Sequence, residues 1–232
     1  MATGLFDEFS GYESPGREIP LDRVRGDSTA LQRVVKGCEA YLETVRAQES
    51  WDRRHEVAAS MATGLQVRGG DITLFCLELD RFEGHERFWG VGCYISALIN
   101  MTEDEEVVLL LGGLGEKVQE IGYRLEGKTL VVEGDGGAYV GKEMRSGRII
   151  VKGSVRFGTG DGMTGGEIRI TGNIEGFGTV KGGEIYRGNK RVDPKATTAT
   201  YDFDRTSFRS YFKDKPLPYG RKRQEGGQPG SR

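Results

Sequence analysis

The first regular pattern of hydrophobic and polar positions in the chain is helical. After Asp27 and Ser28, either of which can cap a helix, apolar residues recur at i, i+3, i+4 and i+7. This stripe consists of Leu31, Val34, Val35, Cys38, Tyr41, Leu42 and Val45. Helical spacing continues less regularly until Gly64 ends it. We expect a helix that packs this stripe on the body of its own chain or presents it to a partner protein.

Two apolar stretches that favour β-strands come next. One runs from Ile72 to Phe82 and the other from Phe88 to Ile99, with the polar residues 83–86 between them. A turn at this place would join the two strands as a β-hairpin. After an acidic loop at 102–106, the apolar residues 107–111 predict a further strand.

The composition changes at Gly112 because the sequence begins to repeat. Residues 112–188 hold 22 of the 37 glycines of the chain. Rows of 19 residues begin at Thr129 and Arg148, a row of 17 begins at Glu167, and a partial row begins at Glu184. Each row opens with a β-rich stretch, and glycine and methionine then recur in register. The repeated positions are Gly134, Gly141, Met144, Gly147, Gly153, Gly160, Met163, Gly166, Gly172 and Gly183.

Such rows predict the turns of a β-solenoid. Equivalent residues of successive turns stack about 4.8 Å apart as parallel strands, so the apolar ones form inward columns. Glycine supplies the corners, where positive φ or a close backbone approach is needed. We therefore expect a mainly β protein: a short right-handed parallel β-helix of coils of about 19 residues. The N-terminal α-helix and the β-hairpin would form an α+β cap on one end.

The same patterns divide the chain into four parts. Residues 1–26 are predicted to be an irregular arm, 27–106 a helix and hairpin cap, and 107–192 the β-helix. Residues 193–232 form a C-terminal segment, which we expect to be largely disordered after 212. Aromatic residues between 200 and 212 could dock on the solenoid or on a partner.

Charge and composition exclude several classes of function. The net charge of −2 offers no basic field for nucleic acid, and the basic residues 221–223 are too few to change this. No run of 18 apolar residues spans a membrane, and the acidic N-terminus does not suit a secretion signal, so we expect a cytoplasmic protein. The three cysteines, Cys38, Cys76 and Cys93, lack metal-ligand spacing and are predicted to be buried thiols.

A search for chemical motifs yields no catalytic, cofactor-binding or metal-binding residue. Gly113 and Gly115 imitate a nucleotide-binding turn, but Gly122 would end the following helix after two turns. Asp135 and Asp161 lie 26 residues apart, which is out of register for a calcium-binding roll. The two histidines, His55 and His85, belong to no recognisable triad or ligand cluster.

The repeats resemble a known family of glycine-rich domains. The string GDGGAYVGKEMRSGRIIVKG at 134–153 and the ending GGEIYRGNKRV at 182–192 are similar to the GXGXG-repeat β-helix family. That family includes the C-terminal domain of the glutamate synthase large chain and the glycine-rich subunit of formylmethanofuran dehydrogenase with its relatives. The resemblance covers about residues 112–192. It implies a structural domain that holds catalytic domains or subunits in place, without a cofactor and without a catalytic residue to transfer.

Three hypotheses for the function remain. The first is a non-catalytic scaffold or accessory subunit that holds a larger enzyme subunit of the glutamate synthase or formylmethanofuran dehydrogenase kind. The second is an enzyme or ligand-binding protein with a site between the solenoid and the N-terminal half. The nearest residues for such a site are Arg81, Glu83, His85 and Arg87. The third is a solenoid that assembles with copies of itself. No nucleic acid or membrane partner is expected.

Overall fold

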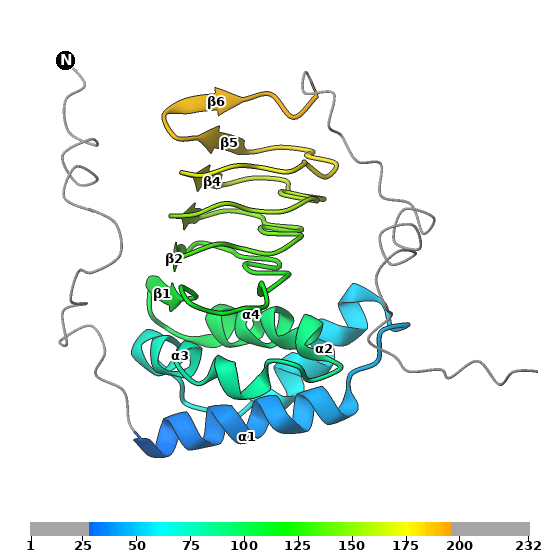
Figure 1. Ribbon diagram of the computed structural model, residues 1–232, viewed down its shortest axis with the longest axis vertical. Helices are drawn as coiled ribbons and strands as arrows, with labels where there is room; N and C mark the ends of the chain where they lie inside the picture. The colour runs from blue at the N-terminus through cyan, green and yellow to red at the C-terminus, as the bar shows by residue number, and fades with distance from the viewer. Residues whose placement is uncertain (1–27, 196–232) are drawn as a thin grey trace, which may run out of the picture.

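The computed structural model describes residues 28–195, which form a β-solenoid standing on a group of helices (Figure 1). The helices are α1 (Ser28–Thr44), α2 (Trp51–Ala62), α3 (Gly69–Cys76) and α4 (Val91–Met101), with the short 3-10 helices η2 (Leu79–Phe82) and η3 (Phe88–Gly90) before α4. The strands are β1 (Glu106–Leu110), β2 (Thr129–Glu133), β3 (Arg148–Val151), β4 (Glu167–Ile170), β5 (Glu184–Arg187) and β6 (Lys190–Val192). The predicted arm and nearly all of the predicted C-terminal segment lie outside the described residues.

The strands form one sheet in chain order. Residues at equivalent positions of the sequence repeat lie opposite one another on neighbouring strands. Thr129, Arg148, Glu167 and Glu184 align across β2 to β5, so each predicted row start begins a strand. All neighbours are parallel except β5 and β6, which pair antiparallel at the end of the solenoid. The predicted β-solenoid is confirmed and has about four turns, with helices at its N-terminal end.

Aliphatic columns fill the interior of the solenoid. One column consists of Leu130, Ile149, Ile168 and Ile185, and a second of Leu125, Met144 and Met163, all at most 1% exposed. Each fully buried side chain of this kind contributes about 1.5–3 kcal/mol relative to exposure. A single turn could not bury these side chains, because each is covered by its counterparts above and below.

The repeated glycines occupy the corners for the two predicted reasons. Gly141 and Gly147 have φ of 68° and 86°, in the left-handed region, and the glycines at the same places in later rows repeat this conformation. Gly153 instead allows close stacking, because a Cβ there would lie 2.5 Å from the carbonyl oxygen of Gly134. The coils therefore owe their tight spacing to the missing side chains.

The predicted hairpin is wrong, because residues 72–99 are helical. α3, η2, η3 and α4 occupy the two stretches that were expected to be strands. In α4 every residue from Val91 to Ile99 is buried, since the helix lies between the other helices and the first coil (Figure 1). A short stretch that is apolar on all sides has no period to distinguish a helix from a strand.

α4 covers the first coil in the place where a further coil would stack. Gly92 lets the helix backbone touch this coil, because a Cβ there would lie 1.6 Å from the carbonyl oxygen of Gln119. The Ser96 hydroxyl donates to the Glu120 carbonyl at 2.9 Å and accepts from the Gly122 amide at 3.0 Å. Side chains of the helix thus satisfy backbone groups that would otherwise be open at the end of the solenoid.

Ion pairs between residues 19 apart repeat the register on the outside of the solenoid. The pairs are Arg124–Glu143, Glu126–Arg145, Glu133–Lys152, Lys142–Asp161, Arg148–Glu167 and Arg156–Glu175. Exposed pairs of this type contribute at most about 1 kcal/mol each. Their value lies in specificity, because opposite charges meet only when each coil is in the correct register.

Two glycine substitutions separate the two requirements at the corners. Gly127 has φ of 70° and open space around it, so Gly127→Ala should cost only the left-handed strain of about 1–2 kcal/mol. Gly147→Ala adds a clash, because the Cβ would lie 2.3 Å from the Lys128 carbonyl oxygen, and should cost about 3 kcal/mol or more. Denaturant unfolding measures both, and equal costs would contradict the role of close stacking.

Candidate functional site

The four residues that the sequence offered as candidates for a ligand site make separate contacts in the structure. Arg81, Glu83, His85 and Arg87 lie in and after η2. Arg87 Nη1 donates to the carbonyl oxygens of Leu42 and Glu43 at 2.7 and 2.6 Å, which ties the segment to α1. Glu83 Oε1 accepts from the backbone amide of Glu116 at 2.8 Å, which ties it to the first coil. Arg87 and Glu83 thus connect different elements, whereas Arg81 pairs with Glu78 and His85 Nδ1 accepts from the Arg87 amide.

The other sequence candidates also have structural roles. The three cysteines are free and buried as predicted, and burial raises the pKa of each thiol. Residues 112–122 form turns of the first coil, with no helix after Gly115. Asp135 accepts from the Ser154 amide at 2.8 Å and pairs with Lys117 at 3.0 Å.

Backbone strain marks one corner of the first two coils. Glu120 and Tyr139 have φ of 62° and 61°, and Arg124 and Glu143 have φ of 55° and 53°. They are the sole non-glycine residues with positive φ between 28 and 195, and the next row has glycine at both places. Each costs about 1–2 kcal/mol, a strain that persists only where the side chain makes compensating contacts.

All four strained residues face helix α2. We name the polar corner the set of residues where α2 meets these coils: Trp51, Asp52, Arg54, His55, Glu120, Tyr123, Arg124, Tyr139, Lys142 and Glu143. Tyr139 stacks edge-on against Trp51 with ring centroids 4.9 Å apart. The remaining contacts form a buried inner layer and a half-exposed outer one.

The inner layer of the polar corner is a buried ion pair. Arg54 Nη1 lies 3.0 Å from Glu120 Oε1, with side-chain exposures of 8% and 3%. The guanidinium carbon lies 4.1 Å from the ring centroid of Trp51 and 5.0 Å from that of Trp89. Lys142 Nζ approaches the other side of the corner, 4.9 Å from the Trp51 centroid. Removing one partner of such a pair leaves an uncompensated buried charge.

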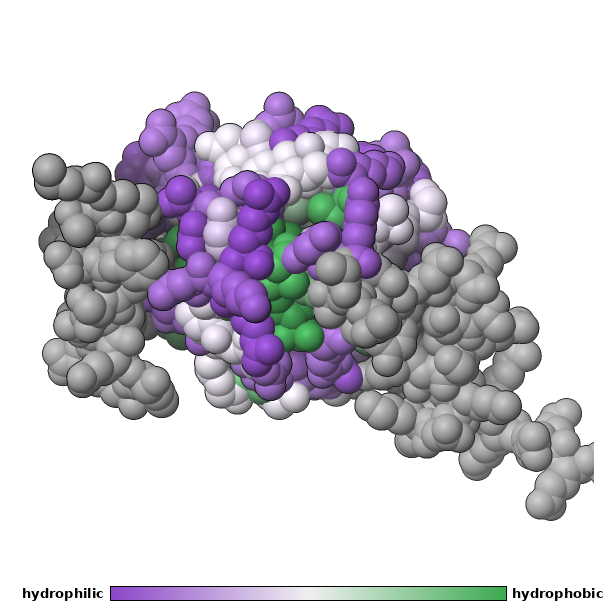
Figure 2. Space-filling view, turned by 90° about the horizontal axis from the view of Figure 1, so that it is seen from above, coloured by the Kyte–Doolittle hydropathy of each residue, from purple (hydrophilic) through white to green (hydrophobic). Residues whose placement is uncertain are grey.

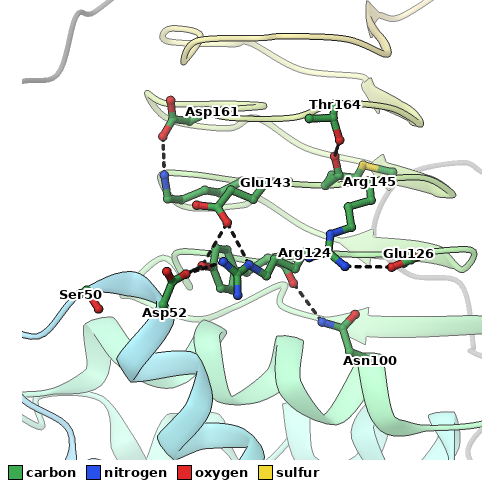
Figure 3. Close-up of polar contacts among 12 residues, drawn as sticks. Ser50, Asp52, Asn100, Arg124, Glu126, Glu143, Arg145, Asp161 and Thr164 are labelled. Atoms are coloured by element: carbon green, nitrogen blue, oxygen red, sulfur yellow. Dashed lines mark hydrogen bonds and ion pairs between the residues drawn. The ribbon is translucent and has the colours of Figure 1, made fainter.

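The outer layer is a network that joins α2 to two coils (Figure 3). The Tyr123 hydroxyl donates to Asp52 Oδ1 at 2.9 Å, and Arg124 also pairs with Asp52. Arg124 Nε donates to Glu143 Oε2 at 2.9 Å, one coil higher. The His55 ring packs edge-on against the Tyr123 ring with centroids 5.1 Å apart.

Burial shifts the proton equilibria of the polar corner. Desolvation raises the pKa of Glu120 to about 7, although the charges of Arg54 and Lys142 act to lower it. Desolvation lowers the pKa of His55, and the charge of Arg124 lowers it further. Desolvation, together with the hydrogen bond to Asp52, raises the pKa of Tyr123.

Three buried polar atoms of the polar corner lack a hydrogen-bond partner: Arg54 Nε, His55 Nε2 and Glu120 Oε2. Each unmet group of this kind costs about 1–3 kcal/mol. The corner therefore holds α2 on the solenoid at a cost in both strain and desolvation. The sequence repeat contained a signal for the polar corner. Glu120 and Arg124 stand at positions where the row two repeats later has glycine.

The end of the solenoid opposite the helices has a different character. We name the distal face the surface made by Ile174, Val180, Lys181, Val192 and the outer edge of β6. The three aliphatic side chains are half-buried and pack on the core, and β6 is the last strand of the sheet. Figure 2 looks onto this end and shows hydrophobic surface with hydrophilic residues beside it.

An open groove of about 410 Å³ runs along the starts of β2 to β4, past Gly127, Gly147 and Gly166. Its charged groups already have partners. Lys128 Nζ donates to the Thr102 carbonyl oxygen, and Arg148 pairs with Glu167 at 3.1 Å. The groove therefore follows from the missing glycine side chains and concentrates no available charge.

Comparison of the chain with models of protein families, with curated proteins and with solved structures found no match. No helix between residues 28 and 195 combines the length and apolar character needed to cross a bilayer. The same residues bring no three histidine, cysteine or carboxylate side chains together in an arrangement that could hold a metal ion. The fold, the polar corner and the distal face are therefore the features from which a function is argued.

Glu120 gives the unfolding free energy a pH dependence of defined sign. Its pKa is about 7 in the folded protein, against about 4.3 in an unfolded chain. Between these values the folded state keeps the proton and the unfolded state releases it. The unfolding free energy should therefore fall by roughly 4 kcal/mol as the pH rises through this window, then level off. Glu120→Gln should abolish the fall.

His55 acts in the opposite sense and serves as the control. Its folded pKa lies below the ordinary 6.5, so the unfolded state binds the proton first as the pH falls. His55→Gln should remove a rise in stability with pH and leave the Glu120 effect in place. Denaturant unfolding from about pH 5 to about pH 8 measures both effects. A wild-type pH profile in Glu120→Gln would contradict the assignment.

Proposed function

We propose that this protein is a non-catalytic scaffold or accessory subunit that uses its β-solenoid to hold a partner enzyme. The observation that carries the proposal is the difference between the two ends of the solenoid. Ser96 and other residues of the helices complete one end, whereas Ile174, Val180 and Val192 at the distal face are only half-buried. Exposed apolar surface enclosed by polar residues is typical of a protein interface.

The build of the solenoid supports a holding role. Glycine corners bring the backbones of neighbouring coils into contact, and ion pairs 19 residues apart fix their register. A surface at one end is thereby kept at a constant distance and orientation from the helices at the other. A scaffold needs this constancy, since bound subunits must be positioned without rearrangement.

The resemblance of the repeats supports the choice of partner. In the GXGXG-repeat family the β-helix holds catalytic domains or subunits in place, so we propose a larger subunit of the glutamate synthase or formylmethanofuran dehydrogenase kind. Three free, buried cysteines are compatible with the reducing cytoplasm, where we place the complex.

Gentle purification of the tagged full-length protein from its source tests the proposal. We expect one larger enzyme subunit to be recovered with the chain in a constant ratio. Its catalytic activity should not require any residue of this chain at its active site, so polar-corner variants such as Arg124→Gln should leave the rate of the complex unchanged. Recovery of the chain alone, as a monomer or as a homo-oligomer, would overturn the scaffold function.

A second candidate function is ligand binding at the polar corner, between the solenoid and the N-terminal half. The observation that favours it is the set of buried atoms without partners, Arg54 Nε and Glu120 Oε2 among them. Perturbed carboxyl and histidine groups gather at binding and catalytic sites. Here the network would need to open, because Arg124 and Asp52 already pair.

Native mass spectrometry of the protein purified from its source tests this second candidate. A bound small molecule would add a defined mass, and Arg124→Gln, which breaks the outer network, should reduce its occupancy by about tenfold or more. The matched control is Arg53→Gln on α2, which changes an exposed arginine that pairs with Glu56. A spectrum without added mass would exclude ligand binding in the purified protein.

A further inference from the structure

We infer that the distal face binds a protein surface with an apolar centre and an acidic rim. The inference rests on the proposed scaffold function and names the surface and the chemistry of the partner. It follows from three properties of this end of the solenoid: its apolar centre, its surplus of cations and its open strand edge.

The apolar centre continues the columns of the interior. Val180 packs above the corner glycine of the preceding row, since a Cβ on Gly160 would lie 3.2 Å from its Cγ2. Val192 is paired in register with the buried Ile185, and Ile174 forms a parallel bridge with the buried Val155. In each earlier row the corresponding surface is covered by the next coil, so a partner with apolar side chains would complete the stack.

The rim of the distal face is cationic. Residues 172–195 contain five lysines and arginines and three carboxylates. Two of the carboxylates are engaged within the solenoid, Glu175 with Arg156 at 3.6 Å and Glu184 with Arg191 at 3.1 Å. Lys181, Lys190 and Lys195 are exposed. The helical part, residues 28–105, has the opposite balance, with eight lysines and arginines and thirteen carboxylates.

This charge favours a different protein over a second copy of the chain in a face-to-face dimer. If the β6 edges of two copies paired antiparallel, the lysines and arginines of both copies would meet, and like charges at a strand edge oppose such pairing. If the partner has an acidic rim, the charges across the interface attract each other. The outer edge of β6 can also accept a strand from this partner. The Ile and Val centre favours a protein over nucleic acid, whose backbone would be bound by cations alone.

Charge reversal at the distal face tests the inference with little risk to folding. Lys181→Glu/Lys190→Glu changes two exposed side chains, and Lys36→Glu/Arg46→Glu on and after α1 is the matched control at the opposite end. Tagged full-length proteins are purified from the source at about 50 and about 300 mM salt. We expect the distal variant to recover about tenfold less of the stoichiometric partner, and the control to recover the wild-type amount. Wild-type recovery should fall at the higher salt.

A photo-crosslinking residue at position 181 identifies what the distal face contacts. We expect a crosslinked peptide from the partner that is rich in aspartate and glutamate around an apolar residue. A crosslink to a second copy of the chain, or to nucleic acid, would overturn the inference in favour of that occupant. Undiminished partner recovery by the distal variant would also overturn it and leave the scaffold function standing. Absence of any stoichiometric partner from the wild type would instead remove the scaffold function itself.

Discussion

Each coil of this protein must bring the chain back to the start of the next strand in register, and left-handed corners make that return possible. Gly141 and Gly147, with their counterparts in the next rows, take a backbone conformation that a side chain would penalise. Where the corners recur every 19 residues, equivalent positions of neighbouring coils stack on one another. The aliphatic columns and the ion pairs align as a consequence. The helical cap depends on the same constraint, because α4 is shaped to fit one coil.

At the polar corner, residues other than glycine take the left-handed conformation, and their contacts with α2 offset the backbone strain. Glu120 and Arg124 stand where glycine would be easier, and each extends its side chain to a partner on α2. The corner thereby joins a local helix to a repetitive structure that offers few distinctive contacts. Its buried pair costs desolvation, and the aromatic faces of Trp51 and Trp89 around Arg54 recover part of that cost.

The sequence predicted the solenoid well because repetition is visible in one dimension. Thr129, Arg148, Glu167 and Glu184 could be aligned by eye, and the sheet register is that alignment. The cap was harder: residues 88–99 are buried on every side, and an apolar run carries no period. The contact between Arg54 and Glu120 spans 66 residues and joins a helix to a coil, and no local pattern encodes such a pairing.

The contacts between neighbouring coils also mean that the solenoid can change in length only by whole coils. A coil touches the coil below, the coil above and little else, so a tandem duplication of residues 148–166 would insert one complete turn without altering either end. Each insertion would move the distal face about 4.8 Å farther from the helices. A protein of this design can serve as a molecular ruler, because the number of coils alone sets the distance between its two ends.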